Sequence, residues 1–161
     1  MKIIAKRRRI ENKTNYTKRR RLLEGKKPRL VIRKTNKYIT IQIIESKVAQ
    51  DKVISGVNSK DLLNYGWPAD KSGSLKSLAA AYLSGILFGK IAKTNKDAIL
   101  DMGLIRNTKG SRIYAALKGV VDSGFKVRHG ASILPSIELI NKENSKEFFD
   151  KVKANILGGK K

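Results

Sequence analysis

Basic residues are concentrated at one end of this chain, and this asymmetry limits how the chain can fold. Residues 1–37 hold sixteen Lys and Arg but only two Glu, a net charge of +14, whereas the whole chain of 161 residues carries +23. A segment with so much like charge repels itself when it is compact and cannot form a core alone. We therefore expect a basic, extended N-terminal arm over residues 1–27, a globular domain over 28–135, and a charged, helical tail over 136–161.

The residues that follow the arm alternate between apolar and polar, as in β-strands. Isoleucine occupies alternate positions of segment 38–44, so its apolar side chains share one face and its polar side chains the other. A β-branched run precedes it at 29–34, and Thr35-Asn36 between the two favours a hairpin turn. A third strand around 52–57 would complete an antiparallel meander.

Helical periodicity dominates the second half of the chain. Apolar residues recur at three- and four-residue spacing after Ser74 and again after Ser111, and a short helix at 59–65 is ended by Gly66. A buried strand is expected over 97–102. This order of elements predicts an α/β fold, in which a mixed sheet of antiparallel hairpins plus a parallel strand is packed with helices.

The composition excludes several classes of protein. The chain has no cysteine, which removes disulfides, thiolate zinc sites and cysteine nucleophiles. The longest apolar run, 78–91, is shorter than the roughly 20 residues that span a bilayer, and it includes Lys90. Neither a signal peptide nor a lipidation motif is visible. We expect a cytoplasmic protein without a membrane partner.

No set of residues predicts an active site. His129 is the only histidine, so it has no second histidine to complete a metal site or a triad. Asp97 and Asp101 share a strand face, but without a third acid, capping or ion pairing explains them better. The loop 106–112 lacks the full Gly-x-x-x-x-Gly-Lys-Ser/Thr spacing of a nucleotide-hydrolysing loop. The sequence predicts no enzyme, metal or cofactor.

The basic segments instead favour nucleic acid as a partner. The arm is rich in arginine, whose planar fork matches phosphate and whose face stacks on bases. The polar face of the hairpin continues this surface, with an ordinary solvated face as the alternative. The loop 106–112 places three cations and free N–H groups at a helix start, where phosphate is favoured; a plain helix cap is the alternative there.

Four stretches, at 7–23, 28–38, 80–85 and 100–119, carry a resemblance to a known family. The Arg-Leu-Val-Ile-Arg-Lys-Thr-Asn-Lys-Tyr hairpin and the Lys-Gly-Ser-Arg helix start are its most specific parts. The chain resembles the large-subunit ribosomal proteins that bind 5S ribosomal RNA, the family numbered eighteen in the universal naming. It is similar to the archaeal type, to which the eukaryotic large-subunit protein five is related.

The resemblance implies a ribosomal protein of translation whose α/β domain and arm dock on 5S ribosomal RNA in the central protuberance of the large ribosomal subunit. It also implies contacts with large-subunit (23S-type) ribosomal RNA and with a neighbouring 5S-binding large-subunit ribosomal protein. Residues 136–161 match no pattern of the family. The RNA-binding candidates carried over by motif are Arg7, Arg8, Arg9, Lys13, Tyr16, Arg19, Arg20, Arg21, Arg29, Arg33, Lys34, Asn36, Lys37, Tyr38, Gln42, Lys109, Ser111 and Arg112.

The charge alone also fits a second class of protein. An architectural DNA-binding protein of the nucleoid would use the same cations on duplex DNA of any sequence. Competition between 5S ribosomal RNA and random duplex DNA separates the two hypotheses.

Overall fold

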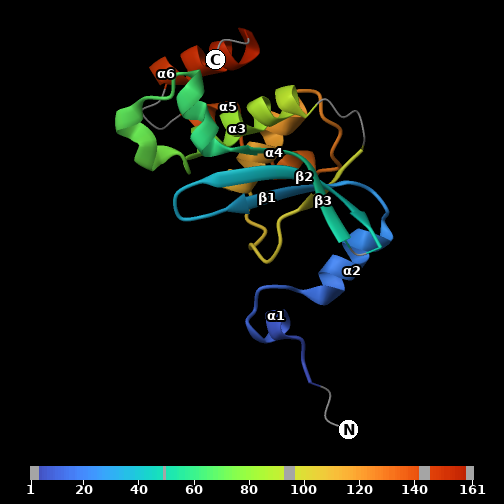
Figure 1. The fold of residues 1–161 in the computed structure, drawn as a ribbon. Helices are drawn as coiled ribbons and strands as arrows, with labels where there is room; N and C mark the ends of the chain where they lie inside the picture. The colour runs from blue at the N-terminus through green and yellow to red at the C-terminus, as the bar shows by residue number, and fades with distance from the viewer. Residues whose placement is uncertain (1–3, 49, 93–96, 142–145, 159–161) are drawn as a thin grey trace.

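The computed structural model describes residues 4–48, 50–92, 97–141 and 146–158. Its elements are α1 (Arg7–Ile10), α2 (Tyr16–Glu24), β1 (Arg29–Lys34), β2 (Ile39–Lys47), β3 (Gln50–Asn58), the 3-10 helices η1 (Ser59–Tyr65) and η2 (Ala69–Ser74), α3 (Leu78–Ile91), β4 (Ile99–Asp101), α4 (Arg112–Asp122), the 3-10 helix η3 (Ala131–Ile133), α5 (Ile137–Asn141) and α6 (Lys146–Gly158). Figure 1 shows the large helices above the sheet and the N-terminal arm below it, with α2 near the sheet and α1 farther out.

The sheet has four strands in the order β3-β2-β1-β4. β1 pairs antiparallel with β2, and β2 with β3, whereas β1 and β4 run parallel. The turn between β1 and β2 is closed by Thr35, whose N–H donates to Tyr38 O at 2.8 Å and whose Oγ1 accepts from Tyr38 N–H at 2.9 Å. The predicted mixed sheet, its hairpin turn and its third strand are confirmed.

The helices cover one face of this sheet, and the core lies between the two layers. Ile39, Ile41 and Ile43 of β2 are at most 1% exposed, which confirms the alternation seen in the sequence. α3 is buried on all sides over residues 79–88, because it contacts the sheet, α4 and α6. A helix that is apolar all round belongs in such a central position.

Two glycines bring the backbones of α3 and α4 into direct contact. A β-carbon added to Gly119 would lie 2.1 Å from Tyr82 O, and one added to Gly85 would lie 2.2 Å from Ala116 O. Because the obstacles are backbone oxygens, no change of rotamer could relieve the clash. This crossing requires a residue without a side chain at both positions.

Two predicted boundaries are wrong by a few residues. α3 does not begin after Ser74, because residues 69–74 form η2; the helix is capped by Ser77, whose Oγ accepts from Ala80 N–H at 3.2 Å. The strand predicted over 97–102 shortens to β4. The chain turns away after it, since Gly103 adopts the left-handed conformation with φ of +64°.

The C-terminal segment forms two helices, α5 and α6, where we predicted one. α6 lies against α3 and η1, and Phe149, Val152 and Ile156 are at most 2% exposed. Trp67 is 3% exposed and packs edge-on against Phe148. The helical nature of the tail is confirmed.

The arm is extended as a whole and contains two short helices, α1 and α2. Neither α1 nor α2 has a buried residue. No helix among the described residues is both long and apolar enough to cross a bilayer. The division of the chain at residues 27 and 135 stays a prediction.

Candidate nucleic-acid interface

The arm presents most of its basic side chains to solvent. The side chains of Arg7 and Arg20 are 86% and 82% exposed, and each pairs only with a glutamate one turn away. Such surface pairs are weak and give way to a stronger partner. Lys13 is 63% exposed beside Glu11. Also exposed are Arg8, Arg9 and Arg21.

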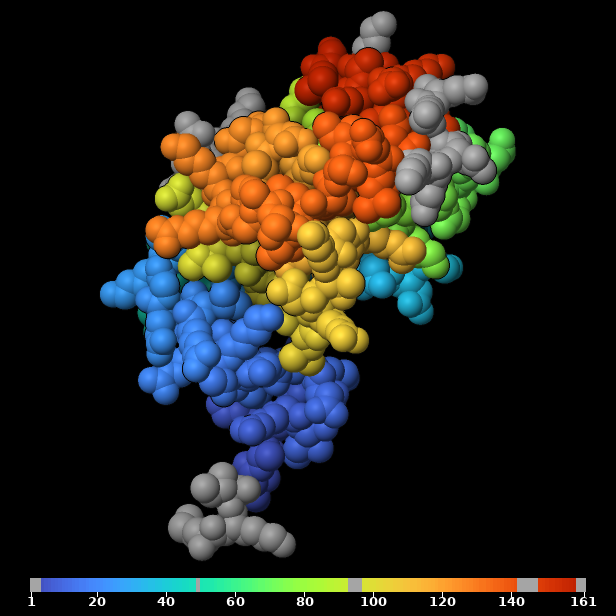
Figure 2. Space-filling model, turned by 180° about the vertical axis from the view of Figure 1, so that it is seen from behind, coloured from blue at the N-terminus to red at the C-terminus, as the bar shows by residue number. Residues whose placement is uncertain are grey.

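α2 contacts the body through two residues that are distant from it in the sequence. The helix begins at Asn15, whose Oδ1 accepts from Lys18 N–H at 3.0 Å. Lys18 Nζ donates to Gly103 O at 2.9 Å, and Arg19 Nη2 pairs with Asp51 Oδ2 at 2.9 Å. Figure 2 shows the loop after β4, in yellow, lying directly beside the blue arm. These contacts hold the arm against one edge of the body.

Arg29 lies beneath this contact, and it corrects one sequence expectation. We expected Arg29 to face RNA, but the residue is 3% exposed. Its Nη1 pairs with Asp101 Oδ2 at 2.9 Å and its Nη2 with Asp51 Oδ1 at 2.8 Å. Because both terminal nitrogens are committed to carboxylates of the same chain, we leave Arg29 out of the interface and assign it a structural role.

Arg33 shares the same carboxylate but remains partly accessible. Its Nη2 pairs with Asp101 Oδ1 at 3.0 Å, and its side chain is 40% exposed. The two arginines lie on the face of β1 opposite the core, since strand side chains alternate. Asp101 therefore joins two cations of β1 at the end of β4, which confirms that its role is ion pairing.

The pKa values of both acids show that the cations dominate this cluster. Burial acts to raise the pKa of Asp101, but the N–H of Gly103 and the charges of Arg33 and Arg29 outweigh it and hold the pKa below its ordinary value. Burial likewise opposes ionisation of Asp51, and hydrogen bonds from Ser46, Arg19 and Arg29 lower its pKa overall. Both carboxylates are charged at neutral pH.

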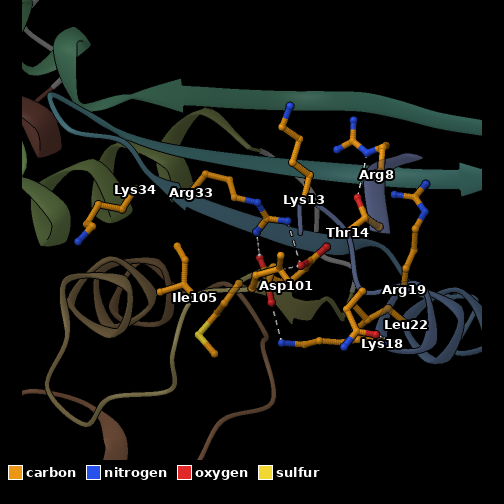
Figure 3. A pocket seen from close by; sticks show the side chains of 14 residues that line it. Arg8, Lys13, Thr14, Lys18, Arg19, Leu22, Arg33, Lys34, Asp101 and Ile105 are labelled. Atoms are coloured by element: carbon orange, nitrogen blue, oxygen red, sulfur yellow. Dashed lines mark hydrogen bonds and ion pairs between the residues drawn. The ribbon is translucent and has the colours of Figure 1, made fainter. Parts of the chain in front are cut away.

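A hollow of about 370 Å³ lies between the arm and the loop after β4. In Figure 3, the heads of Lys18 and Arg33 converge on the turn after Asp101 from opposite sides, while Lys34 and Lys13 extend away from it. Six cations and one acid line this hollow, so its field is positive. The lining residues are Arg8, Lys13, Thr14, Asn15, Lys18, Arg19, Leu22, Arg33, Lys34, Asp101, Met102, Gly103, Leu104 and Ile105.

The hairpin continues the basic surface. Lys34, Asn36 and Lys37 are exposed at its turn, and Tyr38 and Gln42 are half-buried. Gln42 lies on the sheet face that the helices leave uncovered, as the alternation predicted.

The remaining candidates lie at two separate places. Lys109 and Arg112 are exposed at the start of α4, where a second hollow of about 450 Å³ also includes Ser111 and Lys34. Ser111 makes no side-chain cap hydrogen bond to the helix. Tyr16 begins α2, with Lys6 Nζ 4.6 Å from the centre of its ring.

Three residues of this region were absent from our sequence-based set of RNA contacts. Lys18 belongs to the basic cluster of α2, so its charge was a signal that could have included it. Asp51 gave no signal, because only the pairing of β2 with β3 brings it beside Arg29. Gly103 could not be placed until the turn after β4 was known. Within the described residues, no group of three or more acidic or histidine side chains could hold a metal ion.

Comparisons with known proteins give a consistent answer. Residues 2–98 and 92–130 match the family described as ribosomal large subunit proteins 60S L5 and 50S L18. The large ribosomal subunit protein uL18 of Korarchaeum cryptofilum is 48% identical over 148 residues, which cover 91% of this chain and 74% of that protein.

Two methanogen proteins of the same name match over nearly their full length. That of Methanothrix thermoacetophila is 43% identical over 94% of both chains. That of Methanococcoides burtonii is 41% identical over 96% of this chain and 93% of its own. These relatives are ribosomal proteins and not enzymes, in agreement with the sequence analysis.

Proposed function

Because this chain belongs to the family of large-subunit ribosomal proteins 60S L5 and 50S L18, we propose that it binds 5S ribosomal RNA and helps attach that RNA to the large-subunit RNA in the central protuberance. We also propose contacts with a neighbouring 5S-binding large-subunit ribosomal protein, on the strength of the family resemblance. In this role the protein is a structural component of the ribosome.

The observation that carries the proposal is the fixed position of the arm. An ion pair and a hydrogen bond hold α2 against the sheet, so the exposed arginines of the arm, the basic hollow and the hairpin turn follow one another over the surface. An RNA strand or groove could neutralise several of these cations at once and release their counterions. Prior fixation of α2 also lowers the entropy lost on binding.

The proposed interface differs from the sequence-based set at two positions: Arg29 leaves it and Lys18 joins it. Its members are Arg7, Arg8, Arg9, Lys13, Tyr16, Lys18, Arg19, Arg20, Arg21, Arg33, Lys34, Asn36, Lys37, Tyr38, Gln42, Lys109, Ser111 and Arg112.

Titration of fluorescent 5S ribosomal RNA at several salt concentrations tests the proposal. If about six phosphates are neutralised, log Kd should rise with log salt with a slope of roughly 4. The variant with Arg7, Arg8 and Arg9 each replaced by Gln should bind more weakly, and its slope should be lower by about 2, since three contacts are lost.

The matched control replaces Lys60, Lys126 and Lys151 by Gln, which removes the same charge from exposed sites outside the interface. It should retain most of the affinity. Equal losses in the two triple variants would reject the interface. Random duplex DNA that competes as well as unlabelled 5S ribosomal RNA would favour the architectural DNA-binding alternative.

A further inference from the structure

Arg33 differs from the other cations of the interface because its own chain already uses most of its donors. Nη1 donates to Ile32 O at 3.1 Å and to Asp101 O at 2.6 Å, and Nη2 donates to Asp101 Oδ1 at 3.0 Å. An arginine grips phosphate with two parallel in-plane donors. These bonds close the fork formed by Nη1 and Nη2 to a phosphate and leave Nε–H and the second Nη2–H.

One face of the Arg33 guanidinium lies flat on Gly103. A β-carbon added to Gly103 would lie 3.1 Å from Cζ and 3.3 Å from both Nε and Nη2, which places it directly above the centre of the plane. The plane is therefore covered on one side and bonded at its edge. Arg33 lines the hollow and its side chain is 40% exposed, and we infer from the covered first face that the opposite face is the open one.

Part of the lining of this hollow is apolar. Leu22 of α2 and Met102, Leu104 and Ile105 of the loop after β4 line the same hollow. A phosphate gains nothing from such walls, whereas a flat aromatic base does. Arg8 and Lys13 stand at the arm side of the hollow, where they could neutralise a phosphate attached to that base.

The volume of the hollow limits which part of a nucleic acid could enter it. Its volume of about 370 Å³ suits one small ligand and is far too small for a duplex. Proteins that read RNA commonly receive a base that has left its helix and stack it on an aromatic ring or an arginine plane.

We propose that this hollow takes one unpaired RNA nucleotide, with its base stacked on the open face of Arg33 and its phosphate on Arg8 and Lys13. The inference rests on the proposed RNA-binding function and adds a local requirement to it: the RNA must present an unstacked base where the arm meets the sheet. Asp101 acts as the positioning residue, because it holds the Arg33 plane in place.

Three short RNA hairpins test the proposal with the full-length protein. One is fully paired, one carries a single-nucleotide bulge, and one carries the same bulge without its base. Stacking of one base should make the bulged hairpin bind about tenfold more tightly than the other two. Equal affinity for all three hairpins would overturn the proposal.

Two variants separate stacking from charge. Arg33→Lys keeps the positive charge but lacks a planar face, so the tenfold preference should disappear. Lys34→Gln removes a charge from a lining side chain that extends away from the turn after Asp101, and it should weaken all three complexes by the same factor with the preference intact. A preference that survives in Arg33→Lys, or is lost in Lys34→Gln, would contradict stacking on Arg33.

A measurement on the unmodified protein covers the case in which Arg33→Lys fails to fold. A photoreactive 4-thiouridine in the bulge should crosslink to residues 101–105 or to Leu22. Crosslinks confined to other segments would overturn the proposed pocket. If these hairpin results fail while 5S ribosomal RNA still binds, only the pocket is rejected; if 5S ribosomal RNA does not bind, the proposed function itself falls.

Discussion

Two helices are attached to the body of this protein in opposite ways. α4 lies on α3 through Gly85 and Gly119, and its residues Ile113 to Leu117 are at most 4% exposed. α2 has no buried residue and is held by the Arg19–Asp51 ion pair and the Lys18–Gly103 hydrogen bond. Close apolar packing holds α4 on the body, whereas polar and charged contacts hold α2.

The two attachments should therefore respond differently to salt and to RNA. Apolar contact between helices is insensitive to salt, whereas partly exposed ion pairs are screened by it and compete with phosphates for the same cations. The body can therefore stay intact while the arm responds to RNA. Three changes would break or sharpen this contrast.

The largest effect is expected from Gly119→Ala, which attacks the shape-based attachment. The new methyl group would meet a backbone oxygen of α3 at 2.1 Å, so the helices must separate. We expect a loss of about 3 kcal/mol in the free energy of unfolding, the upper end for an overpacked core. Urea denaturation measures it. Gly73→Ala is the control, since nothing lies within 4 Å of its added carbon; a similar loss there would contradict the explanation.

A smaller loss of stability, about 2 kcal/mol, is expected from Asp101→Asn. The change leaves Asp51 as the acid paired with Arg29 and removes the charge that holds Arg33. Asp97→Asn is the matched control, because that carboxylate is 59% exposed and only 3.7 Å from Lys27. An equal loss of stability in Asp97→Asn would show that the buried ion pairs of Asp101 stabilise the fold no more than an exposed pair does.

The pH dependence of stability checks the same pairs. Because the pKa of Asp101 is lowered in the folded protein, its contribution is fully present above the ordinary value of 3.8 and is lost as pH falls through the folded value. The unfolding free energy of the Asp101→Asn variant should therefore fall less steeply below pH 4 than that of the parent protein.

The smallest effect on stability is expected from Asp51→Asn. For this variant the direction of the change in RNA affinity is the informative result. Removing an acid from a basic protein should strengthen RNA binding if only total charge matters. If Asp51 positions Arg19 and so α2, affinity for 5S ribosomal RNA should instead fall a few-fold, and amide exchange in α2 should quicken. Glu24→Gln, which frees only the exposed Arg20, should not weaken binding. Stronger binding by Asp51→Asn would refute the positioning role.

The sequence predicted the parts of the fold that local pattern controls. Alternating isoleucines placed β2, and Thr35-Asn36 placed its turn, because both signals depend on neighbours along the chain. The strand over 97–102 was too long, since its end depends on a left-handed glycine that propensity does not reveal.

The site was harder to predict than the fold. The count of charges identified the arm and the hairpin as basic. Whether each arginine is buried or accessible depends on which acids the sheet brings near it. Arg29 and Arg33 are four residues apart with the same chemistry, yet one is buried and the other lines the basic hollow. Both contact Asp101, which the parallel pairing of β1 with β4 sets beside them, but of the two arginines Arg29 alone also pairs with Asp51, which the pairing of β2 with β3 brings near.

The position of α6 has a consequence for how the protein is made. This helix covers α3, and Lys90 Nζ of α3 donates to Ile156 O near its end. A nascent chain emerges from its N-terminus, so the basic arm is available long before the segment that closes the core. During synthesis, α3 keeps an uncovered apolar side until α6 has been made, so the core between them cannot be completed before then.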